Sequence, residues 1–353
     1  MLHQLKRCQR RLLKVLSNFS RLFYDKHLRN KYLLNQKSKY FITKYHLYTG
    51  ERLNWLQVIL RLQKSIFPTI LPWVIFFAFY GFSISFLYHL GVPIGFKDES
   101  GVITKTVLSF NIGLTLLLVF RTNTAHERFW EGRKLWGSLV NVVRNLTRDI
   151  WIVVKEQDVS DRVSKEATLR LVVAFAVAMK LHLRRERAND ELALLMSETQ
   201  YLRLKDVQHP PLQIAFLIGS YLQHQHDRSR LNIYQLAALH KMVDELVDIL
   251  GGCERILKTP LPLIYTIILR ILVLFYCLIL PIEVVQDLNW WTGLITALVG
   301  LTLLSIEEIG HEIEEPFGHD PNDLPLDVIC NTMLRNVEEL INISPSNSYS
   351  CKL

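Results

Sequence analysis

The sequence predicts an all-α membrane protein with four transmembrane helices and a helical cytosolic domain. Half of its 353 residues are hydrophobic, yet 21% are charged, so apolar and charged residues must be separated into blocks. A soluble protein of this length usually has a more polar composition. Several of the apolar blocks approach the roughly 20 residues that a helix needs to cross a bilayer.

Four apolar segments approach the length of a transmembrane helix. They are residues 66–90, 106–120, 262–282 and 290–306. The third is interrupted by one charge, Arg270, and the fourth opens with two tryptophans, which favour the membrane interface. A fifth apolar run, 169–179, is too short and too closely flanked by charges, so we expect a buried helix of a cytosolic region there.

Loop charges predict which side of the membrane each segment occupies. The N-terminal block and residues 121–261 together hold 36 Lys and Arg, whereas the loops after the first and third spans are short and nearly free of them. We therefore expect both termini and the long middle segment on the cytoplasmic side. The resulting division is a basic N-terminal region (1–65), two spans (66–120), a cytosolic helical domain (121–261), two further spans (262–310) and a cytosolic C-terminal region (311–353).

Charge and cysteine content narrow the partners and cofactors. Residues 1–66 hold 15 Lys and Arg against two acids, which suits attraction to anionic lipid headgroups or control of topology. No motif that reads nucleic acid accompanies this block, so we expect membrane lipid and no nucleic acid as a partner. The five cysteines include no CxxC pair, so neither a disulfide framework nor a zinc site has support from them. We expect no organic cofactor and no catalytic residue.

The second span contains polar residues that are poor neighbours for lipid. Ser109, Asn111 and Thr115 interrupt its apolar sequence. In a membrane helix such residues normally face other helices or water. The helical character then continues beyond residue 120, into a stretch where basic and aromatic residues alternate.

An apolar row runs along the same span. Ile112, Leu116 and Phe120 follow one another at a spacing of four and therefore share one face of a helix. Two interpretations of this row remain open. It packs against a neighbouring span, or it faces a pore and forms an apolar constriction that gates by dewetting.

Three stretches of the sequence resemble one family. The chain from residue 109 reads SFNIGLTLLLVFRTNTAHERFWEGRKLWGSLVNVVRNLTRD, and later stretches read GCERI followed by TPLP, and EEIGHEIEEPFG. In order and spacing they resemble the bestrophin anion channels, particularly their bacterial and plant-plastid branch. The resemblance covers roughly residues 40–335.

The resemblance implies a bestrophin-like homopentamer in which the second span lines a central pore. It assigns the family's three-residue hydrophobic neck to Ile112, Leu116 and Phe120, where Leu116 departs from the usual Ile or Phe. It also implies a second, cytosolic constriction near Ile233 and Tyr234, with tyrosine in place of the usual aliphatic residue.

Passive conduction of monovalent anions, chloride or bicarbonate, is the function that the resemblance implies. The neck helix carries no Asp or Glu that could form an acid-lined cation filter. The basic middle domain raises the local anion concentration, and Arg121 and Arg128 are expected at the inner lip and vestibule of the pore. Because a bacterial member of the family passes cations, cation permeability is the alternative.

Animal bestrophins bind calcium after the fourth span. The matching positions here are Glu312, Glu315, Asp320 and Asp323, whose carboxylates are chemically suitable ligands. The acidic run is interrupted at residues 321–322, a pattern that resembles the bacterial branch without calcium gating. The alternative is that this acidic helix end pairs with basic residues after the second span, including Arg121, Arg128 and Arg133.

Three other classes of protein compete with a channel. A membrane metalloenzyme could use His311 and Glu315, but their spacing is not the HExxH zinc motif, and His224, His226 and His240 are scattered. A carrier is disfavoured because the two pairs of spans do not resemble each other as inverted repeats do. An assembly protein without transport also remains open. We expect a multi-pass protein of the plasma (inner) membrane or of a thylakoid-type membrane.

Overall fold

The computed structural model describes residues 66–94, 102–320 and 322–342, and these residues form helices, turns and short connections without any strand. The basic region 1–65 lies outside the described residues. The helices are α3 (Phe67–His89), α4 (Val102–Val153), α5 (Val159–Leu183), α6 (Asp190–Ala193), α7 (Glu198–Lys205), α8 (Pro210–Asp227), α9 (Ile233–Lys258), α10 (Leu263–Leu288), η2 (Asn289–Trp291), α11 (Thr292–Glu314) and α12 (Leu326–Asn342). The expected all-α architecture is confirmed.

Three helical segments in the described residues are long and apolar enough to cross a membrane, namely Phe67–His89, Lys105–Val153 and Leu263–Glu314. The last contains both α10 and α11, which the short helix η2 joins. The two helices run antiparallel, because Arg270 near the start of α10 pairs with Glu307 near the end of α11. All four apolar stretches expected from the sequence therefore lie in helices, in an integral membrane protein.

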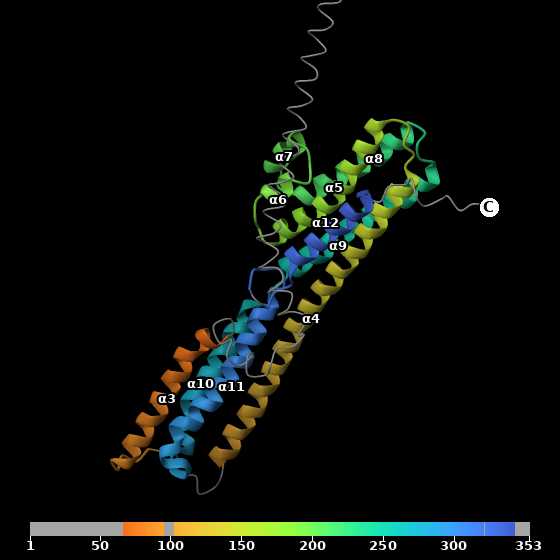
Figure 1. The fold of residues 1–353 in the computed structure, drawn as a ribbon. Helices are drawn as coiled ribbons and strands as arrows, with labels where there is room; N and C mark the ends of the chain where they lie inside the picture. Colours follow the sequence, from red (N-terminus) through yellow and green to blue (C-terminus); the bar gives the residue numbers. More distant parts are fainter. Residues whose placement is uncertain (1–65, 95–101, 321, 343–353) are drawn as a thin grey trace, which may run out of the picture. The chain divides into compact units, whose positions relative to one another are not determined.

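Helix α4 connects the apolar helices to the rest of the chain. It runs for 52 residues without a break, straight through the boundary expected at residue 120. At 1.5 Å per residue it is about 78 Å long. It packs against α10 and α11 and also against α5, α9 and α12 (Figure 1). One helix therefore belongs to both the membrane part and the polar part of the protein.

Glycine allows α3 and α11 to approach closely. A Cβ atom on Gly81 would lie 2.8 Å from the Cα of Gly293, and one on Gly293 would lie 2.6 Å from the ring of Phe82. Small residues at such a crossing are typical of helices that pack inside a membrane. On the other side of α3 the ring of Phe79 is 70% exposed, as expected for a surface that faces lipid.

Helix α5 is the centre of the second group of helices. Every residue from 171 to 181 is buried, and α5 contacts α4, α8, α9 and α12. The run 169–179 was expected to be a buried helix rather than a fifth span, and it is buried among these helices. Its cytosolic location stays a prediction. Because protein rather than lipid surrounds α5, charged residues can lie close to both ends of its apolar run.

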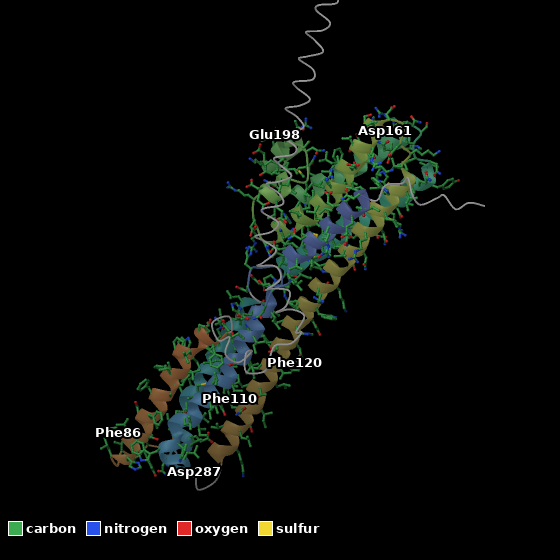
Figure 2. All side chains as sticks on the ribbon, in the orientation of Figure 1. Phe86, Phe110, Phe120, Asp161, Glu198 and Asp287 are labelled. Atoms are coloured by element: carbon green, nitrogen blue, oxygen red, sulfur yellow. The ribbon has the colours of Figure 1, made fainter. Side chains whose placement is uncertain are left out.

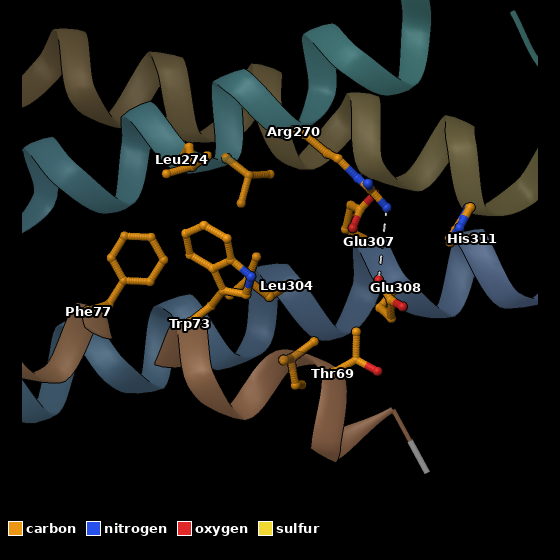
Figure 3. Close-up of a pocket in the computed structure, with 11 residues that line it drawn as sticks. Thr69, Trp73, Phe77, Arg270, Leu274, Leu304, Glu307, Glu308 and His311 are labelled. Atoms are coloured by element: carbon orange, nitrogen blue, oxygen red, sulfur yellow. Dashed lines mark hydrogen bonds and ion pairs between the residues drawn. The ribbon is translucent and has the colours of Figure 1, made fainter. Parts of the chain in front are cut away.

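Two arginines share one carboxylate where α4, α10 and α11 meet. The Nη1 of Arg121 donates to Glu307 at 2.5 Å, and the Nε of Arg270 donates to the same oxygen at 2.8 Å. Arg121 is 1% exposed, whereas the side chain of Arg270 is 49% exposed and also lies 4.0 Å from Glu308. Figure 3 shows Arg270 reaching across from α10 towards Glu307 and Glu308 of α11. The carboxylate of Glu307 thus joins three helices.

A second ion cluster fixes α12 against α5. The Nζ of Lys180, 1% exposed, donates to Asp327 at 2.9 Å and to Glu191 at 2.7 Å. Arg184 pairs with the other oxygen of Asp327 at 3.1 Å. Burial opposes ionisation of Asp327, but the charges and hydrogen bonds of Lys180 and Arg184 outweigh it and lower its pKa to about 2.

Replacing Glu307 with Gln should destabilise the protein strongly. The substitution leaves the buried Arg121 without a counter-charge, and breaking a buried ion pair costs about 3–5 kcal/mol. We expect a clear drop in melting temperature for the purified protein in detergent. Glu308→Gln is the matched control, because among the described residues its ion pair is the 4.0 Å contact with the half-exposed Arg270. Equal melting temperatures for the two variants would contradict a special role for Glu307.

Asp327 should make the stability of the protein depend on pH in the acid range. Because its folded-state pKa lies near 2, below the unfolded value of about 3.9, the carboxylate stabilises the fold above about pH 4. This stabilisation is lost as the pH falls through about 2. We expect the melting-temperature gap between the wild type and Asp327→Asn to be constant above pH 4 and to close below it. Glu339→Gln, at an exposed 4.0 Å pair, should show no gap at any pH.

Candidate functional site

The apolar row of α4 is an uncovered face of the protomer. Ile112, Leu116 and Phe120 are 64%, 52% and 54% exposed. Leu114 and Leu118 are 2% and 1% exposed, because they pack with α10 and α11 in one apolar cluster. A step of two residues turns an α-helix by about 200°, so the row and the buried leucines lie on opposite sides of α4. Phe120 is labelled in Figure 2.

The polar residues of this span divide between the two sides. Asn111 turns towards α10, where its amide donates to the hydroxyl of Tyr276. Thr115 donates to the Asn111 carbonyl at 3.1 Å but stays exposed, and Ser109 is also exposed and bonds only its own helix. The uncovered face of α4 therefore carries hydroxyl groups beside the apolar row.

Exposure alone does not identify a pore wall. Helix α10 has a second row at the same spacing, Ile267, Ile271 and Phe275, which are 44%, 56% and 58% exposed. Lipid contact suits that row, because the charged side chain beside it, Arg270, is turned towards Glu307 of α11. The row on α4 differs because Ser109 and Thr115 lie next to it, and hydroxyl groups favour water or another helix over lipid.

The two arginines expected at the pore lip are not exposed charges in the protomer. Arg121 is buried in its pair with Glu307. It lies on the side of α4 opposite Ile112 and Leu116. Arg128 donates to the backbone carbonyl groups of Ile256 at 2.8 Å and Glu314 at 3.3 Å, and also to that of Thr259. In the protomer Arg121 is held by a carboxylate of α11, as the alternative interpretation expected for this residue, and the lip position stays a prediction. The guanidinium group needs a counter-charge in an apolar surrounding, and Glu307 is the one within reach.

The residues of the expected cytosolic constriction lie in the first turn of α9. Ile233 is 56% exposed and Tyr234 is 85% exposed. Asn232 begins the helix with a capping box, in which its side chain accepts from the Gln235 N–H at 2.8 Å and Gln235 bonds the Asn232 N–H in return. The cap fixes the start of α9, and both side chains are exposed in the protomer, so their role in a constriction stays a prediction.

The four carboxylates proposed for calcium lie around the end of α11, but the described residues do not gather them into one ligand group. Glu312 accepts from the amide of Asn322 at 2.6 Å. Asp323 is 1% exposed and accepts from the Asp320 N–H at 2.6 Å. Glu315 is exposed, and it does not join His311 in a metal-binding group among the described residues. His311 instead lines a cavity of about 390 Å³ with Arg270 (Figure 3).

A side-chain cluster that the sequence did not reveal joins His182, His209 and Glu254. The Nε2 atoms of both histidines lie 2.7 Å from the same Glu254 oxygen. Burial opposes ionisation of Glu254, but hydrogen bonds from Lys258, His209 and His182 outweigh it and lower its pKa to about 2. Glu254 lies 45 positions from His209 and 72 positions from His182, so no local spacing could have predicted the cluster.

The sequence matches one family model and several known proteins over most of its length. A family model described as bacterial/fungal bestrophin protein matches residues 48–339. A voltage-dependent anion channel-forming protein of Nostoc sp. is 51% identical over 84% of this chain and 95% of its own length. A protein of the same description from Synechocystis sp. is 46% identical over 84% of this chain and 94% of its own.

Solved structures agree with the sequence relatives. A bacterial bestrophin homologue from Klebsiella pneumoniae matches with a TM-score of 0.69 and 27% identity, over 77% of this chain and 98% of that one. The family match, the near-complete overlap with both relatives and the shared fold lead to one conclusion: this chain belongs to the bestrophin family.

Proposed function

We propose that the protein is an oligomeric ion channel that passively conducts monovalent anions, chloride or bicarbonate. The observation that carries the proposal is the uncovered apolar row of α4, flanked by hydroxyl groups, on the helix that the family places at the pore. The names of the relatives, voltage-dependent anion channel-forming proteins, support the same function. The family resemblance supports five copies around one axis, and a channel accounts for the site without any catalytic group.

In the proposed pore, Ile112, Leu116 and Phe120 of each subunit form the hydrophobic neck. Five copies of the row would place rings of apolar side chains around the axis, where a narrow bore loses water readily. An ion must shed part of its hydration to pass such a neck. Weakly hydrated monovalent anions lose the least, so the neck favours them over multivalent ions. Ile233 and Tyr234 are proposed to form the second constriction on the cytosolic side.

Several features support anion over cation passage. The sequence of α4 from residue 102 to residue 126 contains no Asp or Glu, so the neck offers no carboxylate to a cation. Exposed basic residues follow farther along the same helix, at Arg133 and Lys134. Arg121 and Arg128 bond other groups of the protomer. We therefore assign the attraction for anions to the net charge of the chain, which is +8.

We also infer the placement of the chain in its membrane. The loop charges support both termini and the domain 121–261 on the cytoplasmic side, in the inner membrane or a thylakoid-type membrane. Four spans are proposed, with α10 and α11 counted separately. The basic region 1–65 is proposed to contact anionic lipid, and nucleic acid is not proposed as a partner. Calcium is not assigned a role, because Glu312 and Asp323 are already hydrogen-bonded within the chain.

The reversal potential of the purified protein in a planar bilayer tests the selectivity. In a tenfold gradient of sodium chloride we expect it to lie close to the chloride equilibrium potential, because the neck helix has no acidic residue. Replacing chloride with a large impermeant anion on one side is the control. A reversal potential near that of sodium would show the cation-permeable alternative, and absence of current in several lipid compositions would contradict a channel.

Removing the neck side chains should raise the conductance. The triple substitution Ile112→Ala, Leu116→Ala and Phe120→Ala widens the bore and lowers its dewetting barrier, so we expect larger currents or loss of closed periods. The matched control is the triple alanine variant of the second row, at Ile267, Ile271 and Phe275, which has the same spacing and similar exposure. Equal currents in the two triple variants would contradict the neck assignment.

A further inference from the structure

We propose that His182, His209 and Glu254 bind one divalent transition-metal ion of the zinc class, which links three helices of the cytosolic domain. The two imidazoles and the carboxylate come from the end of α5, the residue that begins α8, and the last turns of α9. They are the only three His, Cys, Asp or Glu residues in the described parts of the chain whose ligand atoms all lie within 4.8 Å of one another.

The geometry of the cluster is close to that of a metal site. Both histidine Nε2 atoms face the same oxygen of Glu254 at 2.7 Å, and the two rings are 4.6 Å apart between centroids. Ligand atoms around a tetrahedral zinc ion, with bonds of about 2.0–2.1 Å, lie roughly 3.3 Å from one another. Each histidine nitrogen therefore needs to move away from the Glu254 oxygen by only a fraction of an ångström to receive an ion, and the two nitrogens already lie within 4.8 Å of each other.

The kinds of ligand select the kind of ion. Two imidazole nitrogens with one carboxylate oxygen are a common ligand set of zinc, with water in the fourth position. Calcium and magnesium prefer sites built from oxygen atoms alone. The site is therefore chemically different from the four carboxylates at the end of α11, and nothing in the proposed conduction pathway depends on it.

The environment allows an ion to enter and keeps the carboxylate in place. The side chains of His182, His209 and Glu254 are 21%, 34% and 15% exposed, so the cluster is reached from solvent without lying open to it. Lys258 holds the second oxygen of Glu254 at 2.7 Å, which leaves the first oxygen directed at both rings. A ligand whose orientation is fixed by a neighbour in this way binds metal more tightly.

One existing bond opposes the metal-bound state. The Nδ1 atom of His209 accepts from the Leu212 N–H at 3.4 Å and caps α8. When Nε2 binds a metal, Nδ1 carries the proton and can no longer accept this bond. The contact is long, and the buried Pro211 still packs at the start of α8, so one weak cap is exchanged for a coordinate bond.

Metal binding to the full-length protein in detergent tests the proposal. After stripping with a chelator, the protein is titrated with zinc against a chelating dye, and the bound metal is counted after desalting. We expect one ion per protomer and at least about tenfold weaker binding in His182→Gln, His209→Gln and Glu254→Gln. Zinc addition should raise the melting temperature of the wild type but not of these three variants. Cobalt bound to the wild type should show the visible absorption of a tetrahedral site.

His319→Gln is the matched control for these variants. His319 pairs with Glu186 at 2.5 Å, but among the described residues no third ligand joins that pair. We expect this variant to bind zinc like the wild type. Unchanged affinity in His182→Gln and His209→Gln, or no stoichiometric zinc and no tetrahedral cobalt spectrum in the wild type, would overturn the proposal. The cobalt spectrum needs no variant, so a substitution that fails to fold does not obscure the result.

Discussion

The carboxylate of Glu307 fixes the rotation of α4, and the rest of the membrane part depends on that rotation. Arg121 points into the interface with α10 and α11 because Glu307 is there, and Arg270 completes the charge on the same oxygen. Leu114 and Leu118 lie on the same side of α4 as Arg121, and all three side chains are buried. Once that side is fixed inward, Ile112, Leu116 and Phe120 must face outward. The apolar row is thus set by a charge on the opposite face of the helix.

A second constraint connects the apolar helices to the group of helices packed around α5. Helices α9 and α11 both end close to α4, and the last carbonyl groups of a helix have no partner within it. Arg128 donates to carbonyl groups at both ends, those of Ile256 and Glu314, so a single side chain of α4 caps two helices. The carboxylate of Glu314 in turn accepts from the Leu261 N–H at 3.0 Å, in the connection that leads into α10. The basic residues of this region act as packing groups between the two parts.

Much of the fold could be predicted from the sequence, and the failures share one physical cause. Apolar length identified the spans, and a spacing of four identified the row on α4, because both are properties of one local segment. The family resemblance was needed to choose a pore for that row, since the row on α10 at Ile267 has the same pattern. The burial of Arg121 and the cluster around Glu254 depend on residues that are distant in the chain. Local patterns carry no information about such partners.

The unbroken helix α4 has a consequence for how the channel changes state. The residues of the row and those that pack with α5, α9 and α12 belong to one rod of 52 residues, so neither end can turn about the rod's axis without the other. Thr115 lies about 100° round the helix from Leu116. A twist of part of that angle, applied at the end of α4 that packs with α5, α9 and α12, would bring hydroxyl groups towards the position of the leucines. In the proposed pore, wetting would then be controlled by torque transmitted along a single helix rather than by the motion of a separate gate.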